Sequence, residues 1–455
     1  MAQKTAEILK FIVPKVPLIL STTFNHYVYG PPKPSWSFRL SLTISLLRSF
    51  LTQLNDVPIR DTQAMSKSSY ENIPVGPQVI ASNAIISNLY RDKASEHMDR
   101  LLKQCGIDSS KLGWDWRNDP KAEEPLEAEW TEEKVKNEKY SEGRTVLYLH
   151  GGGYILGSRH THRWASSSMA CLGGAKVLTI DYRLAPDSPF PAAIVDALAA
   201  YLYLLNPPTD SGIAPVDSKN IVIMGDSAGG GLTFATMLAI RDAGLPVPGG
   251  IVGLSPWLDL LHSMPSILTN AGSDYLPSDG FTQGGQSSIK KMSELAATIG
   301  SKDVLLHHPE LPEIQYYASN AILECSYVSP LLEKNFEGTC PMLLIVGDGE
   351  MLRDEAIVFV KKNEGDVHLL LYDDMPHVFP MFDFLPTSNH ALVQAGEFIV
   401  KTTTTEDKDG LIGKKSYFRV GVDCQQRPLE EDAVVGWEDR LGKLGGGREV
   451  LVQLE

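Results

Sequence analysis

Residues 220–230 read NIVIMGDSAGG, and this stretch decides the fold. The apolar run 220–224 is typical of a buried strand, and small and apolar residues continue as far as Ile240 in a pattern typical of a helix. A strand, a sharp glycine turn and a helix are the context in which G-x-S-x-G presents a serine at the apex of a turn. Gly225 and Gly229 allow the backbone to turn tightly and keep the Ser227 hydroxyl accessible.

A second motif lies upstream, where residues 145–153 read TVLYLHGGG. Another apolar run is followed here by His150 and three glycines. A glycine run at the end of a strand directs bare backbone N–H groups towards an oxygen that becomes negatively charged during a reaction. The two motifs together, in this order and each at the end of a strand, predict acyl chemistry at a serine.

Around these motifs, strand and helix signals alternate along the chain. Short runs rich in Val, Ile and Leu indicate buried parallel strands at 145–149, 176–181, 220–224, 250–255, 341–346 and 367–372. Helical stretches separate most of them, at 191–205, 229–243, 352–363 and 388–401. This alternation predicts an α/β fold with a mostly parallel central sheet flanked by helices.

The chain resembles the hormone-sensitive-lipase family of α/β-hydrolases, in particular its fungal esterase-like and arylacetamide-deacetylase-like branch. The resemblance covers roughly residues 120–400 and is carried by VLYLHGGGY at 146–154, DYRLAP at 181–186 with FPAA at 190–193 and Asp196, GDSAGG at 225–230 and MPH at 375–377. It implies the α/β-hydrolase fold, a cap built from N-terminal helices and an insertion, and acyl-ester chemistry without a cofactor. It also implies that Tyr182, Arg183 and Asp196 support the fold.

Four segments are expected. Residues 1–115 form an N-terminal helical arm or cap, and residues 116–401 form the catalytic core, with a cap insertion at 258–326. Residues 402–455 form a poorly ordered C-terminal tail. Within the arm, residues 38–51 carry apolar residues at helical spacing with a thin polar face, which predicts a helix packed on the core; the alternative is an interfacial helix that contacts membrane or lipid substrate.

The reacting residues are expected in the order serine, acid, histidine along the chain. Ser227 is the predicted nucleophile, and His377, in a proline-containing loop after the run 367–372, is the predicted base. The acid belongs in the loop after 341–346. Alignment with the family's acid-x-Leu-x-Asp pattern selects Glu350 in place of the usual aspartate and leaves Asp348 as a rival. Next to the histidine, Val378 also departs from the family, which commonly has glycine at that position.

The predicted oxyanion hole comprises the backbone N–H groups of Gly151, Gly152 and Ala228. His150 is expected to hold the glycine loop in place, and Asp226 is expected to shape the serine turn. The pair His307-His308 suggests a metal site only weakly, because no carboxylate or cysteine stands beside it at ligand spacing.

Composition limits the partners. A net charge of −15 argues against a nucleic acid as partner, because nucleic-acid binding requires a positively charged surface. The five scattered cysteines form no C-x-x-C pair, and the apolar stretch 8–20 is interrupted by two lysines and two prolines. These features predict a cytoplasmic protein, with peripheral contact to an intracellular membrane through the N-terminal helices as the further option.

The predicted function is that of a serine carboxylic-ester hydrolase. The family resemblance implies that it acts on small or medium acyl esters, such as an acetylated sterol, a xenobiotic or a secondary metabolite. Lactone hydrolysis, amide hydrolysis and acyl transfer remain alternatives, because all share the acyl-enzyme. The plant gibberellin receptors keep this fold but lack the catalytic histidine, so the presence of His377 speaks against a ligand-sensing role.

Overall fold

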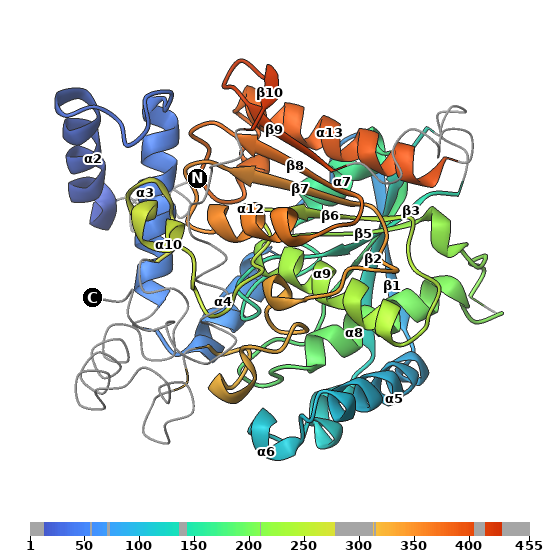
Figure 1. Cartoon of the computed structure of the whole chain (residues 1–455). Coiled ribbons are helices and arrows are strands. Elements are labelled where there is room, and N and C mark those ends of the chain that lie inside the picture. Colours follow the sequence, from blue (N-terminus) through green and yellow to red (C-terminus); the bar gives the residue numbers. More distant parts are fainter. Residues whose placement is uncertain are drawn as a thin grey trace, which may run out of the picture.

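The computed structural model describes residues 13–54, 57–70, 73–135, 143–209, 211–277, 313, 315–404 and 415–429. These residues form one twisted sheet with helices on both faces (Figure 1). The strands follow the order β1-β2-β4-β3-β5-β6-β7-β8-β9-β10. Their bounds are β1 Val79–Ile86, β2 Leu126–Glu133, β3 Thr145–Leu149, β4 Lys176–Ile180, β5 Ile221–Asp226, β6 Gly250–Leu254, β7 Met342–Gly347, β8 Val367–Tyr372, β9 Ser416–Val420 and β10 Gln426–Pro428.

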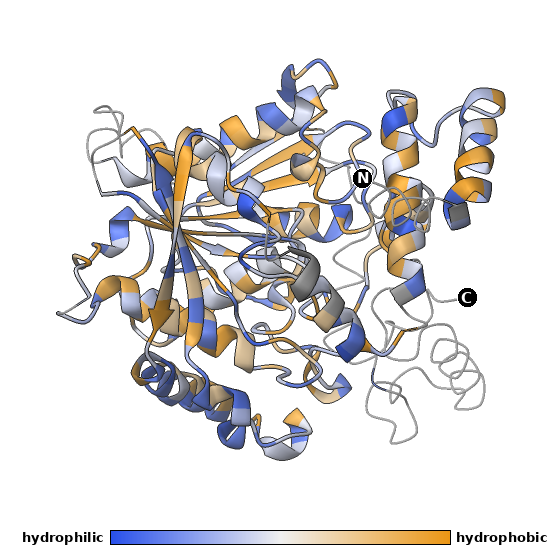
Figure 2. Ribbon diagram, turned by 180° about the vertical axis from the view of Figure 1, so that it is seen from behind, coloured by the Kyte–Doolittle hydropathy of each residue, from blue (hydrophilic) through white to orange (hydrophobic). Residues whose placement is uncertain are grey.

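The six predicted strand runs are confirmed as β3 to β8. Strand β3 pairs in parallel with β4 and β5, and β5, β6, β7, β8 and β9 continue in parallel across the sheet. The central strands are buried on both faces, which explains why each reads as an unbroken apolar run (Figure 2). All their carboxyl ends therefore meet at one edge of the sheet.

Helices cover the two faces in two groups. Helices α8 (Ala192–Leu205), α9 (Ser227–Asp242) and α12 (Arg353–Lys362) pack on one face, and α5 (Asn88–Gln104) packs outside α8. Helices α7 (Arg163–Leu172) and α13 (Pro386–Thr403) cover the other face. The described chain also contains α2 (Val16–Val28), α3 (Phe38–Leu54), α4 (Ile59–Tyr70), α6 (Ser109–Leu112) and α10 (Ser266–Thr269).

Two expected boundaries are wrong. Strand β1 lies inside the segment 1–115 that was expected to be a helical arm, yet it pairs antiparallel with β2 in the main sheet. At the other end, β9 and β10 lie inside the expected tail 402–455, yet β9 extends the sheet beside β8 and buries Val420. These are border strands with a polar or mixed composition, so they lack the apolar runs by which the central strands were recognised.

The helix expected at 38–51 is confirmed as α3, and its packing follows the core-facing expectation. Trp36, just before the helix, and Leu40 and Ile44 within it recur at four-residue spacing and are buried against Phe382, Phe384 and Leu385. The N-terminal segment is thereby held against the loop that follows the carboxyl end of β8. Helix α2 lies outside α3 at the margin of the molecule (Figure 1).

The expected structural role of Asp196 is also visible. Its fully buried carboxylate accepts hydrogen bonds from the side chains of Arg183 and Arg91, with Arg91 Nε at 2.6 Å from Asp196 Oδ1. Because this places a paired charge between α5 and α8, the residue fastens the α5 layer to the core.

Candidate active site

The turn from β5 into α9 holds Ser227 in an uncommon backbone conformation. Its φ is +52°, in the left-handed region that non-glycine residues rarely adopt. A side chain on Gly225 would place its Cβ 2.3 Å from the Gly229 carbonyl oxygen, and one on Gly229 would place its Cβ 2.1 Å from the Leu149 carbonyl oxygen. Only glycine fits at either position, so the sequence motif is a geometric requirement of the turn.

His377 lies in the loop that follows β8, just before the 3-10 turn Phe379–Met381. Its Nε2 atom lies 2.9 Å from Ser227 Oγ, so the serine hydroxyl donates a hydrogen bond to the ring. Both residues are buried, which shields the pair from bulk water. The structure thus brings together two residues 150 positions apart in the sequence.

Glu350 lies on the other side of the His377 ring. Its Oε1 atom faces His377 Nδ1 at 3.9 Å, which is longer than a hydrogen bond. Neither atom has a hydrogen-bond partner among the described residues. The second oxygen, Oε2, accepts hydrogen bonds from Ser255 Oγ at 2.5 Å and from the Gly347 N–H at 3.0 Å. The carboxylate is therefore fixed through one oxygen while the other remains directed at the histidine.

Asp348, the rival acid, forms ion pairs elsewhere. Its carboxylate lies 3.2 Å from Arg419, 3.5 Å from Arg353 and 3.9 Å from Lys33. Asp354 accepts a hydrogen bond from the Ser266 N–H at 2.9 Å. Of the acidic residues 348, 350 and 354, only Glu350 forms a pair with His377.

The charge of the histidine is set by several buried carboxylates. Burial disfavours the imidazolium form, but Glu350, followed by Asp274 and Asp226, outweighs it and raises the pKa of His377. Burial also raises the pKa of Glu350, against the opposing effects of His377 and the Ser255 hydroxyl. A histidine in this setting is a stronger base than one in water, and its protonated form is stabilised by neighbouring negative charge.

The glycine loop after β3 lies against the serine turn, but its N–H groups are arranged differently from the expectation. The Gly151 N–H donates to Asp226 Oδ1 at 3.1 Å, so the prediction that it points into an oxyanion hole is wrong. Within the described residues, no hydrogen-bond acceptor is found for the N–H groups of Gly152, Gly153 and Ala228. Gly152 and Gly153 have φ values of 118° and 64°, and these reorient the amides after Gly151.

His150 and Asp226 occupy the supporting positions expected of them. His150 Nδ1 lies 2.8 Å from the Gly151 carbonyl oxygen, and its ring stacks on Tyr182 with centroids 4.2 Å apart. Burial lowers the pKa of His150 to about 3, so the ring is neutral and Nδ1–H donates to that carbonyl. Asp226 additionally accepts a hydrogen bond from the Tyr148 hydroxyl at 2.8 Å.

Sequence reasoning missed Ser255 as a member of the site. It follows β6 with a φ of +46°, and its hydroxyl accepts the Val378 N–H at 2.9 Å while it donates to Glu350. One side chain thus connects the acid to the histidine loop. The available signal was its place at the carboxyl end of the strand next to β5, where parallel α/β sheets carry their functional side chains.

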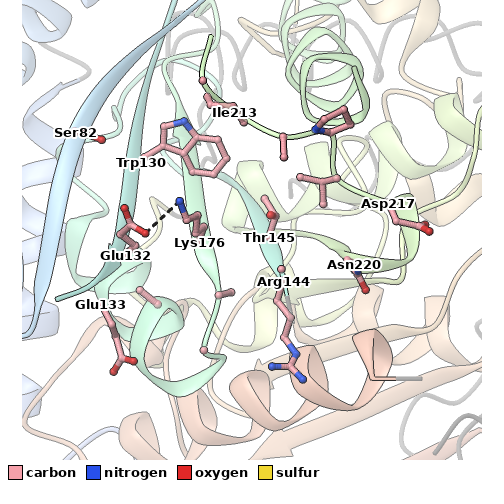
Figure 3. A pocket seen from close by; sticks show the side chains of 18 residues that line it. Ser82, Trp130, Glu132, Glu133, Arg144, Thr145, Lys176, Ile213, Asp217 and Asn220 are labelled. Atoms are coloured by element: carbon pink, nitrogen blue, oxygen red, sulfur yellow. Dashed lines mark ion pairs between the residues drawn. The ribbon is translucent and has the colours of Figure 1, made fainter. Parts of the chain in front are cut away.

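A hollow of about 760 Å³ lies elsewhere in the molecule, at the amino ends of β3, β4 and β5 (Figure 3). Trp130, Thr145 and Asn220 line it, and an ion pair joins Lys176 to Glu132 at its margin. Ser227 stands at the opposite, carboxyl end of β5. This hollow is therefore separate from the reacting residues.

No group of three or more His, Cys, Asp or Glu side chains with metal-binding geometry is present in the described ranges. His307 and His308 lie outside those ranges. No described helix is long and apolar enough to cross a bilayer.

Comparisons with known proteins match this arrangement. A family model described as alpha/beta hydrolase fold matches residues 146–381, a stretch that includes Ser227, Glu350 and His377. An acetyl-hydrolase of Streptomyces hygroscopicus is 33% identical over 270 residues, which cover 58% of this chain and 78% of that protein. An esterase of Acinetobacter venetianus is 31% identical over 258 residues, which cover 56% of this chain and 73% of that protein.

Among solved structures, an esterase from the bacterial hormone-sensitive lipase family has a TM-score of 0.55 with this chain at 28% identity. The alignment covers 81% of this chain and 100% of that one. Sequence and structure therefore point to the same set of relatives.

Proposed function

This chain belongs to the hormone-sensitive-lipase family of α/β-hydrolases and is a serine hydrolase of carboxylic esters, and we propose that it cleaves small or medium acyl esters through an acyl-enzyme on Ser227. The observation that carries the proposal is the 2.9 Å hydrogen bond between Ser227 Oγ and His377 Nε2 at a strained turn. A serine hydroxyl becomes an effective nucleophile only when a base takes its proton, and this bond supplies the base.

In the first step, Ser227 Oγ attacks the acyl carbon while its proton passes to His377 Nε2. Glu350 stabilises the imidazolium that forms and accepts the Nδ1–H, which fixes the ring in the productive tautomer. The distance of 3.9 Å between Oε1 and Nδ1 shortens as the ring becomes charged, because charge-assisted N–H···O bonds are typically about 2.7–2.9 Å long.

The oxyanion of the tetrahedral intermediate binds the N–H groups of Gly152, Gly153 and Ala228. Their lack of other acceptors supports this assignment, and the engagement of Gly151 with Asp226 speaks against its participation. Ala228 lies in the first turn of α9, where N–H groups have no partner within the helix and the helix dipole favours negative charge. His377 then returns its proton to the departing alcohol, and water attacks the acyl-enzyme by the same route.

The acyl group is expected to be short. This expectation comes from the name of the Streptomyces relative, an acetyl-hydrolase, and from an aromatic side chain at the site. The ring of Tyr275 lies 5.6 Å from the His377 ring, measured between centroids. A rigid, buried aromatic ring in this position restricts the space beside the histidine.

The proposal is tested with acetyl, butyryl, octanoyl and palmitoyl esters of p-nitrophenol, together with labelling by a fluorophosphonate. Ser227→Ala should lose both hydrolysis and labelling, with turnover reduced on the order of a millionfold. Ser168→Ala is the matched control, because Ser168 is half-buried and its hydroxyl donates to the Trp164 carbonyl of its own helix. Label uptake at the wild-type rate in Ser227→Ala would identify another nucleophile, and a preference for the palmitoyl ester would overturn the short-acyl assignment.

We further propose that α2 contacts a lipid surface peripherally. The segment 13–54 contains no acidic residue in a chain of net charge −15, so it carries no carboxylate that would repel an anionic lipid surface. Exposed apolar side chains gather on and just after α2, which Figure 2 shows at the margin of the molecule: Val16, Leu20, Phe24, Tyr27, Val28 and Tyr29. An exposed apolar patch of this kind on a surface helix is typical of an interaction surface.

Flotation with vesicles containing phosphatidylserine tests this contact. The wild-type chain should float, and the double variant Leu20→Ser/Phe24→Ser should not. Leu89→Ser removes an equally exposed leucine on α5 and should leave flotation unchanged. Wild-type protein that remains at the bottom of the gradient contradicts the proposal.

A further inference from the structure

Residues 270–275 of the insertion, which we call the brace, lie over the loop that carries Glu350. Side chains of the brace bind a backbone group of each of the four consecutive residues 348–351. The bonds are Asn270 Nδ2 to the carbonyls of Asp348 (3.0 Å) and Glu350 (2.8 Å), Ser273 Oγ to the carbonyl of Gly349 (2.8 Å), and the Met351 N–H to Asp274 Oδ2 (2.6 Å). The acid loop is thus held along its whole length by one segment far away in the sequence.

The brace also contacts the histidine. The ring of Tyr275 packs against the ring of His377, with centroids 5.6 Å apart. The fully buried Asp274 carboxylate accepts the Tyr275 N–H at 2.6 Å as well as the Met351 N–H. Both partners of the Glu350–His377 pair are therefore in contact with the same six residues.

Arg48 of α3 holds the brace from the outside. Its Nε donates to the Asp274 carbonyl at 2.8 Å, and its Nη2 donates to the carbonyls of Ala271 at 3.0 Å and Gly272 at 3.1 Å. Arg48 lies four residues beyond Ile44 and so continues the stripe of α3 that packs on the histidine loop. A planar guanidinium with a fixed fork of donors suits three neighbouring carbonyls.

Building on the proposed function, we infer that Arg48, Asn270 and Asp274 are positioning residues of the catalytic reaction, through which the N-terminal segment sets the approach of Glu350 to His377. The distance of 3.9 Å between Glu350 Oε1 and His377 Nδ1 must shorten by about 1 Å for a hydrogen bond to form. The backbone of 348–351 therefore has to be held at a fixed distance from the histidine ring. A misplacement of about that size is enough to cost on the order of a hundredfold in rate. The brace and Arg48 supply that restraint.

The test compares two arginines of α3 in the full-length protein with the soluble acetyl ester as substrate. Arg48→Gln should lower kcat roughly 10- to 100-fold and change KM less than about threefold, because substrate contacts are not altered. Arg39→Gln is the matched control; Arg39 lies 4.0 Å over the Phe384 ring and does not contact the brace. Arg48→Lys should recover part of the lost kcat, since an ammonium group also donates to carbonyls.

A pH profile separates positioning from general weakening of the fold. The groups that face His377 are Ser227, Glu350, Asp226, Asp274 and Tyr275. Asp274→Asn removes one of three negative charges that favour the imidazolium, so the acidic limb of kcat/KM should move to lower pH. A purely structural loss would reduce the amount of active enzyme without moving this limb.

If Arg48→Gln fails to fold, as judged by urea unfolding, Ser273→Ala provides the milder variant, because it removes a single hydroxyl, which donates to the Gly349 carbonyl at 2.8 Å and to the Asn270 carbonyl at 3.3 Å. It should lower kcat several-fold with KM unchanged. A kcat within about twofold of wild type in the folded variant, or an equal loss in Arg39→Gln, overturns the inference. Hydrolysis that survives in Ser227→Ala overturns the proposed function and this inference with it, whereas hydrolysis lost in Ser227→Ala but retained in Arg48→Gln overturns the inference alone.

Discussion

Replacing Ser255 by alanine should weaken both the fold and the reaction, because one hydroxyl serves two buried partners. It donates to Glu350 Oε2 at 2.5 Å and accepts the Val378 N–H at 2.9 Å. Loss of a hydrogen bond to a charged group costs about 1.5–3 kcal/mol, and a buried N–H without an acceptor costs about 1–3 kcal/mol. The free energy of unfolding should therefore fall by roughly 3–5 kcal/mol.

The effect on catalysis follows from the same two bonds. Ser255 connects the loop of Glu350 to the loop of His377, so its removal frees the two side chains to shift relative to each other. A displacement near 1 Å costs on the order of a hundredfold in turnover. KM should change little, since the hydroxyl is already engaged on both sides by the protein.

Equilibrium unfolding in urea, followed by two spectroscopic probes, and turnover of a short acyl ester together measure this prediction. Ser166→Ala is the control: that serine is equally buried, but its hydroxyl bonds only to the Arg163 carbonyl one turn earlier, at 3.3 Å. Its loss should cost less than about 1 kcal/mol. If Ser255→Ala loses no more stability than the control and retains wild-type turnover, the proposed connection between acid and histidine loops is refuted.

Three further outcomes follow from the site. Glu350→Gln should lower turnover on the order of ten-thousandfold, as loss of an orienting carboxylate does in serine proteases, whereas Asp348→Asn should lower it only a few-fold; the reverse order would exchange their roles. The acidic limb of kcat/KM should have its midpoint above the ordinary histidine value of about 6.5, because His377 must be neutral to accept the proton and its pKa is raised; a midpoint below that value contradicts the assignment. Val378 has a φ of +46°, which favours glycine, so the free energy of unfolding of Val378→Gly in urea should exceed that of Val378→Ala by about 1 kcal/mol. A higher free energy of unfolding for Val378→Ala would show that the backbone there is not strained.

The central fold and the reacting residues were predictable because local patterns and topology agree. Parallel strands buried on both faces read as apolar runs, and the residues after their carboxyl ends must meet at one edge. Ser227 follows β5, Glu350 follows β7 and His377 follows β8, so the order of strands in the sequence already implies their proximity. The family pattern then separated Glu350 from Asp348.

The missed features depend on geometry that the residue letters do not contain. Which amide of the run Gly151 to Gly153 faces the serine is decided by two positive φ values, and glycine permits many others. Asp274 stands in an insertion without periodicity, and its partner Met351 is 77 positions away. Border strands such as β1 escaped notice because only part of each strand is buried.

The two borders of the sheet differ in how well they resist pairing with another molecule. Beyond β8, the chain adds β9 and then the short β10, which ends at Pro428. Proline has no N–H to donate, and the exposed Gln426 and Arg427 beside it are poor partners for a hydrophobic strand, so this border is closed to a neighbouring chain.

The opposite border has no such protection within the described chain. Strand β1 spans eight residues and exposes the side chains of Ile80 and Ile85. Long border strands that expose apolar side chains are the usual starting points for intermolecular β-pairing. Aggregation of this protein at high concentration or during refolding should therefore begin at β1, and a lysine at position 80 or 85 would be the simplest way to suppress it.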